Sequence, residues 1–195
     1  MTPLVYFVRH GQTAWNAEYR LQGQADTEIT EFGRQQADRN GRRLAELIPD
    51  PSPFDFVASP MKRTRETMER IRVALGLPRS GYRTEPRIVE LSFGDWQGFT
   101  FPELEARDPG STKARLLDKW RFVPPGEGAE SYAMLQERVA PWFEALDRPT
   151  VCVTHGGIIR VIFRLVEGMS EDEAAALDIP QDTVLRQKDG RLEWL

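Results

Sequence analysis

The chain has 195 residues, of which 40% are hydrophobic and 29% are charged, and its formal net charge at pH 7 is -4. This profile is typical of one globular domain with a substantial core, and it argues against a surface that binds nucleic acid or membranes. The N-terminus lacks the basic segment and the long apolar stretch of a secretory signal, and the single cysteine, Cys152, cannot form an internal disulfide. We therefore expect a cytoplasmic protein.

The first third of the chain predicts two units in which a strand is followed by a helix. LVYFV, residues 4–8, has the length and apolar character of a buried strand, and Thr30 is placed to cap a helix whose small inner residues allow close contact with the sheet. FDFVA, residues 54–58, predicts a second buried strand. Ser59 can cap the helix that follows, and Pro60 suits its first position because no N–H is needed there.

Residues 92–130 break this alternation. They are rich in glycine, proline and aromatic residues, and they contain one short helical pattern, at about 111–120. We expect a single domain, residues 1–195, in which this segment is an excursion that covers the active site. Its aromatic side chains form either a small core of the excursion or a wall that contacts the substrate.

The last third predicts a helix from about 131 to 146, a buried strand in TVCVT, residues 150–154, and a further helix with apolar residues at helical spacing from Ile158 to Val166. Asp189-Gly190 between two short apolar runs predicts a terminal hairpin. Strands that alternate with helices predict an α/β fold, a three-layer α/β/α sandwich with a mostly parallel central sheet.

Three polar groups follow directly after predicted strands. His10, the turn from Ser59 to Arg63, and His155 all lie just past a carboxyl end, which is where open α/β sheets bind ligands. With Arg9 beside His10, such a site suits an anion, and arginine matches phosphate oxygens well. A neutral imidazole can attack phosphorus, and nearby guanidinium charges lower the pKa of a histidine and so favour that neutral form.

Two other interpretations remain open at this point. The two histidines could bind zinc, although neither has a metal-binding spacing or a carboxylate cluster beside it, and guanidinium groups would repel the cation. They could also be structural residues that are hydrogen-bonded at strand ends.

Four motifs together resemble one family. VRHGQTAWN, ASPMKRTRET, VELSFGDWQG and VTHGG, in this order, are similar to the histidine phosphatase superfamily, in the branch that also contains cofactor-dependent phosphoglycerate mutases. The motifs span most of the chain. The resemblance implies the phosphoglycerate mutase-like fold and an enzyme that needs no metal and no cofactor and acts on a small phosphorylated metabolite.

The resemblance also implies a role for each matching residue. His10 would become phosphohistidine, and Glu90 would protonate the leaving oxygen and then activate water. Arg9, Arg63 and His155 would hold the phosphoryl oxygens. The remaining phosphate-binding or substrate-binding positions would be Gly11, Asn16, Gln22, Gly23 and Gly156.

The segment after Glu90 favours a phosphatase over a mutase. Mutases of this family carry a tyrosine where this chain has Phe93, and an adjacent pair of arginines that is missing between Glu90 and His155. A phosphoglycerate mutase remains the alternative, because Lys113, Arg115, Lys119 and Arg121 could supply positive charge by another route. A catalytically silent relative that binds phosphorylated ligands ranks third. The sequence leaves the substrate and the oligomeric state open.

Overall fold

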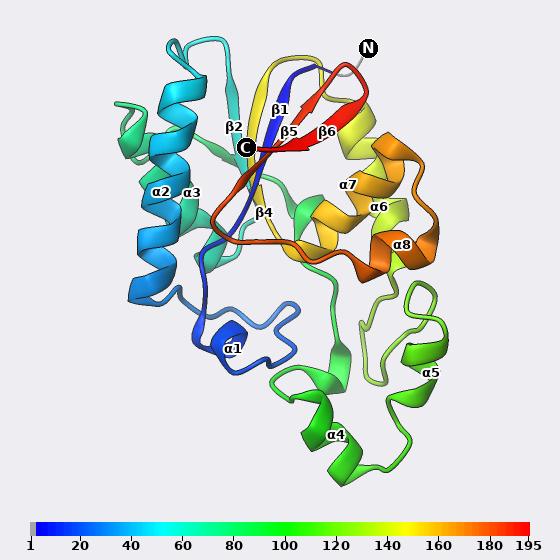
Figure 1. Cartoon of the computed structure of the whole chain (residues 1–195). Helices are drawn as coiled ribbons and strands as arrows, with labels where there is room; N and C mark the ends of the chain where they lie inside the picture. The colour runs from blue at the N-terminus through cyan, green and yellow to red at the C-terminus, as the bar shows by residue number, and fades with distance from the viewer. Residues whose placement is uncertain (1–2) are drawn as a thin grey trace.

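A six-stranded sheet runs through the middle of the molecule (Figure 1), as seen in a computed structural model that describes residues 3–195. The strand order is β3-β2-β4-β1-β5-β6. The first four strands in this order are parallel, β5 runs antiparallel to β1, and β6 runs antiparallel to β5. The strands are β1 (Val5–Arg9), β2 (Asp55–Ala58), β3 (Arg83–Thr84), β4 (Thr150–Thr154), β5 (Val184–Lys188) and β6 (Arg191–Trp194).

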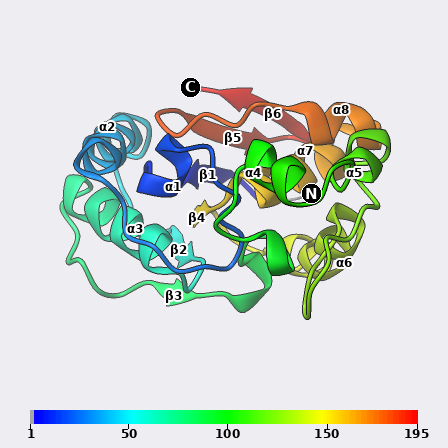
Figure 2. The ribbon, with the colours of Figure 1, turned by 90° about the horizontal axis from the view of Figure 1, so that it is seen from below.

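Helices cover both faces of the sheet, which confirms the predicted three-layer α/β/α architecture. One face carries α2 (Glu31–Leu47) and α3 (Lys62–Ala74), and the other carries α6 (Tyr132–Glu144), α7 (Gly156–Glu167) and α8 (Glu171–Ala176), as the view along the strands shows (Figure 2). The shorter helices are α1 (Ala14–Ala17), α4 (Phe101–Arg107), α5 (Lys113–Leu117) and the 3-10 turns Pro86–Ile88 and Gly94–Trp96. None of the helices in residues 3–195 is long and apolar enough to cross a membrane.

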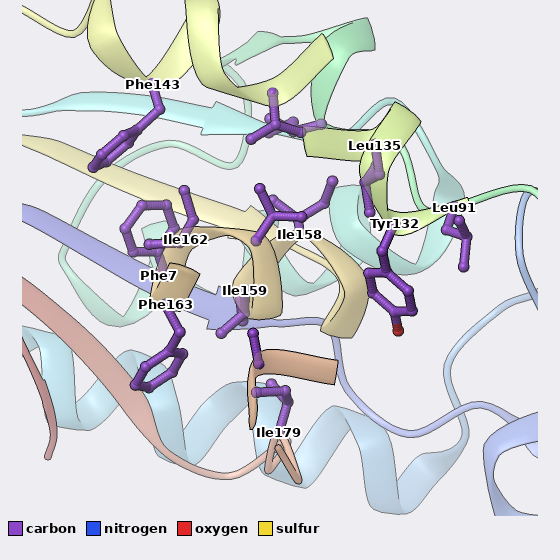
Figure 3. Close-up of a cluster of buried hydrophobic side chains, with 14 of the residues drawn as sticks. Phe7, Leu91, Tyr132, Leu135, Phe143, Ile158, Ile159, Ile162, Phe163 and Ile179 are labelled. Atoms are coloured by element: carbon purple, nitrogen blue, oxygen red, sulfur yellow. The ribbon is translucent and has the colours of Figure 1, made fainter. Parts of the chain in front are cut away.

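The alternation of side chains along β1 divides the core in two. Val5 and Phe7 pack toward α6 and α7, whereas Tyr6 and Val8 pack toward α2 and α3. Figure 3 shows the first of these clusters, in which Phe7 lies beside the isoleucines of α7. Because both faces of the sheet are buried, nearly all consecutive residues of its central strands are apolar.

Two expectations about the helix starts have different outcomes. Thr30 caps α2 as predicted, since its hydroxyl accepts a hydrogen bond from the Gly33 N–H. The expectation for the second helix is wrong: α3 begins at Lys62, after Met61, so neither Ser59 nor Pro60 has the predicted place. Ser59 instead follows directly after β2: its N–H donates to the carbonyl of Val153 on β4, and its hydroxyl contacts His155.

The two glycines of α2 make close contacts with a loop and with a neighbouring helix. A Cβ atom on Gly33 would lie 2.3 Å from the carbonyl oxygen of Gln12, in the loop after β1. A Cβ atom on Gly41 would lie 2.8 Å from that of Ala74 on α3. The glycines therefore bring α2 close to the His10 loop and to its neighbouring helix.

The segment 92–130 lies beyond the carboxyl ends of the parallel strands, with α4 and α5 at its outer edge (Figure 1). The helix predicted at 111–120 is shorter, Lys113–Leu117. Trp96 and Trp120 are buried in the main cluster around α7, and the Trp120 ring stacks on Tyr132 with centroids 5.2 Å apart. Most aromatic residues of the segment thus join the main core, whereas Phe101 is 39% exposed.

The terminal hairpin is confirmed. Asp189 and Gly190 connect β5 to β6, and both have a positive φ, 51° and 74°. A two-residue turn with positive φ at both positions matches the right-handed twist of the paired strands.

Candidate active site

The strand order brings the two histidines together. β4 lies between β1 and β2, and Thr154 pairs with Arg9 while Val153 pairs with Ala58, so the three strands end at the same level. His10 follows directly after β1 and His155 directly after β4, and their ring centroids are 5.2 Å apart. The predicted convergence of His10, His155 and the turn after β2 is confirmed.

His10 is held in one tautomer. Its Nδ1 lies 2.8 Å from the carbonyl oxygen of Gly11. Because a carbonyl oxygen only accepts hydrogen bonds, Nδ1 carries the proton and Nε2 carries the free lone pair. Burial, and then the charges of Arg63 and Arg9, lower the pKa of His10 well below its ordinary value. The imidazole is therefore a neutral base whose Nε2 is available as a nucleophile.

His155 is equally buried and makes a different contact. Its Nε2 lies 2.8 Å from the Ser59 hydroxyl, whereas its Nδ1 is buried without a hydrogen-bond partner. Burial and the neighbouring Arg63 lower its pKa well below the ordinary value. With the Ser59 hydroxyl as donor to Nε2, the Nδ1–H remains free to donate to a ligand.

Two arginines of the site are fixed by backbone carbonyls. Arg63 has no exposed surface, and its two terminal nitrogens donate to the carbonyls of Gly23 at 2.7 Å and Ala25 at 2.8 Å. Arg9 donates to the carbonyl of Ile179 at 2.5 Å. The Nε atoms of both arginines are buried without a partner. Burial lowers the pKa of Arg63 to about 10, so this side chain still carries its charge at neutral pH.

Three buried nitrogens of the site thus lack partners: Nε of Arg9, Nε of Arg63 and Nδ1 of His155. A buried donor without a partner costs about 1–3 kcal/mol. An oxyanion bound beside His10 would bring acceptors of the kind that these nitrogens lack, which is the chemistry that a phosphoryl group offers.

Glu90 approaches the site from the segment after β3. Its Oε2 accepts from the Gly157 N–H at 3.1 Å, and its Oε1 accepts from the Leu91 N–H at 3.0 Å. Its own carbonyl accepts from the side chains of Gln24 and Arg138. The carboxyl group is thereby fixed at the N-terminus of α7, next to His155.

A cavity of about 150 Å³ connects these groups. It is lined by most of the predicted site residues: Arg9, His10, Asn16, Gln22, Gly23, Arg63, Glu90 and Gly156. Gly11 does not line it, because its N–H donates to the Thr67 hydroxyl at 3.1 Å and a Cβ atom there would lie 2.2 Å from the Gly33 carbonyl oxygen. The structure places the Gly11 backbone against α3 and α2, and its role in phosphate binding stays a prediction. His155 lies behind the lining residues, against His10.

The structure adds residues to the site that sequence reasoning missed. The Gln181 side chain donates to the His10 carbonyl at 2.9 Å and to the Asn16 side chain at 3.1 Å. These bonds connect the VRHGQTAWN motif to the C-terminal segment. Tyr132 and Arg160 line the cavity from α6 and α7. No motif marks Gln181, and Tyr132 and Arg160 lie on helices whose periodicity predicts only a buried face.

We expect stability to fall as the pH is lowered from about 7 to 5.5. The only two histidines of the chain have lowered pKa values in the folded protein, so the unfolded chain binds protons in this range that the folded chain does not. Each such proton costs about 1.4 kcal/mol per pH unit once the pH is below the unfolded pKa. Urea unfolding should show this slope, reduced by about half in His10→Gln. An equal slope in the variant would contradict the lowered pKa of His10.

We expect Gly157→Ala to lower activity without lowering stability. The added Cβ would lie 2.2 Å from Glu90 Oε1, so the carboxyl group must move, and a displacement of about 1 Å can cost about a hundredfold in rate. Gly76→Ala is the control: it adds the same methyl group after the far end of α3, where no atom lies within 4 Å of the added Cβ, so turnover should stay unchanged. Turnover of an alkyl phosphate and thermal unfolding test this pair; equal turnover in both variants would contradict the placement of Glu90.

Comparison with known proteins agrees with the geometry. The family model of the histidine phosphatase superfamily (branch 1) matches residues 5–191. Glucosyl-3-phosphoglycerate phosphatase of Mycolicibacterium vanbaalenii is 36% identical over 179 residues, which cover 85% of this chain and 74% of the relative. A probable phosphoglycerate mutase of Erwinia tasmaniensis is 31% identical over 196 residues, which cover 98% of this chain and 87% of the relative.

Solved structures give the same result. A mycobacterial glucosyl-3-phosphoglycerate phosphatase in complex with VO3 superposes with a TM-score of 0.79 at 29% identity, and the match covers 99% of this chain and 96% of that one. The resemblance predicted from the four motifs is confirmed. The chain belongs to the histidine phosphatase superfamily, in its branch 1.

Proposed function

We propose that the protein is a metal-independent phosphatase that hydrolyses phosphomonoesters of small metabolites through phosphohistidine on His10. The observation that carries this proposal is the neutral His10 beside three unpartnered buried nitrogens of Arg9, Arg63 and His155. Arg9, His10 and Arg63 line one cavity, and this shared lining supports a nucleophile with donors for the phosphoryl oxygens beside it.

The first half-reaction forms a P–N bond and breaks the ester P–O bond. Nε2 of His10 attacks phosphorus, and the Gly11 carbonyl stabilises the imidazole through its Nδ1–H. The leaving oxygen takes a proton from Glu90 in its protonated form, so that a neutral alcohol departs. Arg9, Arg63 and His155 stabilise the charge on the transferring group.

The second half-reaction returns the enzyme to its starting state. Glu90, now a carboxylate, takes a proton from water, and the oxygen of that water attacks the phosphorus of phosphohistidine. The P–N bond breaks, inorganic phosphate leaves, and Nε2 regains its lone pair. Glu90 thus acts as acid and then as base in the two steps.

The size and composition of the cavity support a small substrate and arginine-based charge neutralisation. A volume of about 150 Å³ is below the roughly 300–1,000 Å³ of pockets for drug-sized ligands. Within residues 3–195, no group of three or more His, Cys, Asp or Glu side chains is arranged to hold a metal ion.

The proposal includes a single domain and a cytoplasmic location. The segment 92–130 packs Trp96 and Trp120 into the main cluster around α7, which supports one domain in which this segment covers the active site. One buried cysteine, Cys152, suits a compartment in which disulfides do not form.

Labelling tests the intermediate. Enzyme quenched in acid-free denaturant after mixing with ³²P-labelled phosphomonoester should carry acid-labile phosphate on His10, and His10→Gln should lose both the label and at least about a thousandfold of the activity. A chelator should leave activity unchanged. Release of phosphate without labelled enzyme, or loss of activity in the chelator, would contradict the mechanism. Conversion of 3-phosphoglycerate to 2-phosphoglycerate without phosphate release would favour the mutase alternative.

Leaving-group dependence tests Glu90. Glu90→Gln should lose about a hundredfold or more on alkyl phosphates, whose leaving oxygen needs a proton, and clearly less on p-nitrophenyl phosphate, whose phenolate leaves unprotonated. The ratio of kcat/KM for the two substrates measures this difference. An equal loss on both would show that another group donates the proton.

A further inference from the structure

An ion pair between Glu130 and Arg138 lies beside the segment that carries Glu90. Glu130 directly precedes the cap of α6, and Arg138 lies in the second turn of that helix. The Arg138 Nε donates to Glu130 Oε1 at 2.8 Å, and its Nη2 donates to Oε2 at 2.9 Å, so the pair is bidentate and has a fixed geometry. With exposed side-chain fractions of 15% and 24%, the pair is screened less by water than an exposed pair is.

Arg138 also binds the main chain at Glu90 and before it. Its Nη1 donates to the carbonyl of Arg87 at 2.6 Å, and its Nη2 donates to the carbonyl of Glu90 at 3.3 Å. The side chain of Gln24, from the loop after α1, donates to the same Glu90 carbonyl at 3.1 Å. The main chain of Glu90 is therefore held from two sides, by α6 and by this loop.

Glu130 binds the main chain just after Glu90. Its Oε2 accepts from the Ser92 N–H at 3.1 Å, and its own N–H donates to the Ser92 carbonyl at 3.0 Å. Ser92 and Glu130 are the two ends of the segment 92–130, so these two hydrogen bonds join the ends of the excursion. We call Ser92, Glu130 and Arg138 the neck clamp. Glu90 lies two residues before this clamp.

Both carboxylate oxygens of Glu130 act as acceptors. Oε1 accepts from Arg138 Nε, and Oε2 accepts from Arg138 Nη2, from the Ser92 N–H and from the Gln24 side chain at 3.4 Å. A glutamine here would have one oxygen and one NH2 group, and the NH2 group would face a donor on either side. Glu130→Gln should therefore disturb the clamp at almost constant side-chain size.

We propose that Glu130 and Arg138 are positioning residues for the general acid: they hold the main chain at Glu90 so that its carboxyl group reaches the leaving oxygen. This inference rests on the proposed phosphatase function and adds residues that serve its proton transfer. The carboxyl group itself is bound by the Gly157 N–H at the start of α7. The clamp fixes the other end of the residue, and a proton donor needs both, because proton transfer requires hydrogen-bond contact with the leaving oxygen.

The arginines that would bind the phosphoryl group are held by other contacts. Arg9 is fixed by the carbonyl of Ile179. Arg63 is fixed by the carbonyls of Gly23 and Ala25. Loss of the neck clamp should therefore weaken proton transfer to the leaving group and leave the binding of an anion at these arginines in place.

Two substrates of similar shape provide the test, phenyl phosphate and p-nitrophenyl phosphate. Phenolate leaves poorly without a proton, whereas p-nitrophenolate leaves unprotonated. A displaced Glu90 carboxyl group should lower kcat/KM for phenyl phosphate by about ten- to a hundredfold and that for p-nitrophenyl phosphate clearly less. The ratio of kcat/KM for p-nitrophenyl phosphate to that for phenyl phosphate measures this difference, and losses that both substrates share cancel in it.

Variants connect this ratio to the clamp. Arg138→Met and Glu130→Gln should each raise it, as Glu90→Gln does. Arg70→Met is the matched control: Arg70 has the same exposed fraction of 24%, and its ion pair with Asp38 joins α2 and α3 on the other face of the sheet (Figure 2), so the ratio should stay unchanged. Inorganic phosphate should inhibit the clamp variants as strongly as the unaltered enzyme, which a general loss of structure would not allow.

Two further variants sharpen the test. Gln24 is exposed, so Gln24→Met tests the support of the Glu90 carbonyl even where a clamp variant fails to fold, and it should raise the ratio by a smaller factor. The double variant Glu90→Gln/Arg138→Met should have the same ratio as Glu90→Gln alone, because two changes that act through one group are not additive.

The outcomes separate the two proposals. An unchanged ratio in Arg138→Met and Glu130→Gln, or in Gln24→Met where these two do not fold, would overturn the positioning role while phosphate release and labelling of His10 still support the phosphatase. A ratio in the double variant well above that of Glu90→Gln would overturn it as well. No phosphate release from either substrate and no label on His10 would overturn the proposed function and the positioning role with it.

Discussion

The hydrogen bond from Nδ1 of His10 to the carbonyl of Gly11 is the interaction on which the site depends. It fixes the proton on one ring nitrogen and leaves the other as the nucleophile. Burial beside Arg63 and Arg9 then keeps the ring neutral. The same two arginines that lower the pKa of the histidine carry unpartnered nitrogens for an anion. The conditions for nucleophilic attack and for phosphate binding are therefore met by one set of contacts.

Close backbone packing maintains this geometry. The loop after β1 can lie against the start of α2 only because Gly11 and Gly33 have no side chains, since a Cβ on either would come within 2.4 Å of the other segment. Gly157 leaves the space that the Glu90 carboxyl group occupies, and the N–H of the same residue binds that group. Positions that resemble simple helix or turn glycines in the sequence thus set the positions of the nucleophile and of the proton donor.

The fold could be predicted largely from the sequence because its signals are local. Three apolar runs followed by polar residues indicated the parallel strands, and Thr30 and Asp189-Gly190 indicated a helix start and a turn. Ser59 was misassigned because a serine before a helix has the same local pattern whether it caps that helix or, as here, contacts a residue that follows another strand, His155. Pairing of β2 with β4 decides between the two, and pairing is not visible in a local pattern.

Within the site, prediction succeeded for residues in motifs and failed for residues that depend on tertiary packing. His10, Arg63, Glu90 and His155 lie in motifs, and the structure brings them together. Gln181 reaches His10 from the far end of the chain, and Tyr132 and Arg160 reach the cavity only because α6 and α7 pack against each other. These contacts lack a signal in the sequence because they depend on how the helices are arranged.

The state of His10 itself can be measured directly by ¹⁵N NMR of the imidazole nitrogens in the unliganded protein. The chain has only two histidines, so the spectrum contains two ring systems, and His10→Gln assigns them. At pH 6, His10 should be neutral with its proton on Nδ1 and an unprotonated Nε2. A His10 ring that is protonated on both nitrogens at this pH, or that is neutral with the proton on Nε2, would contradict its assignment as the nucleophile.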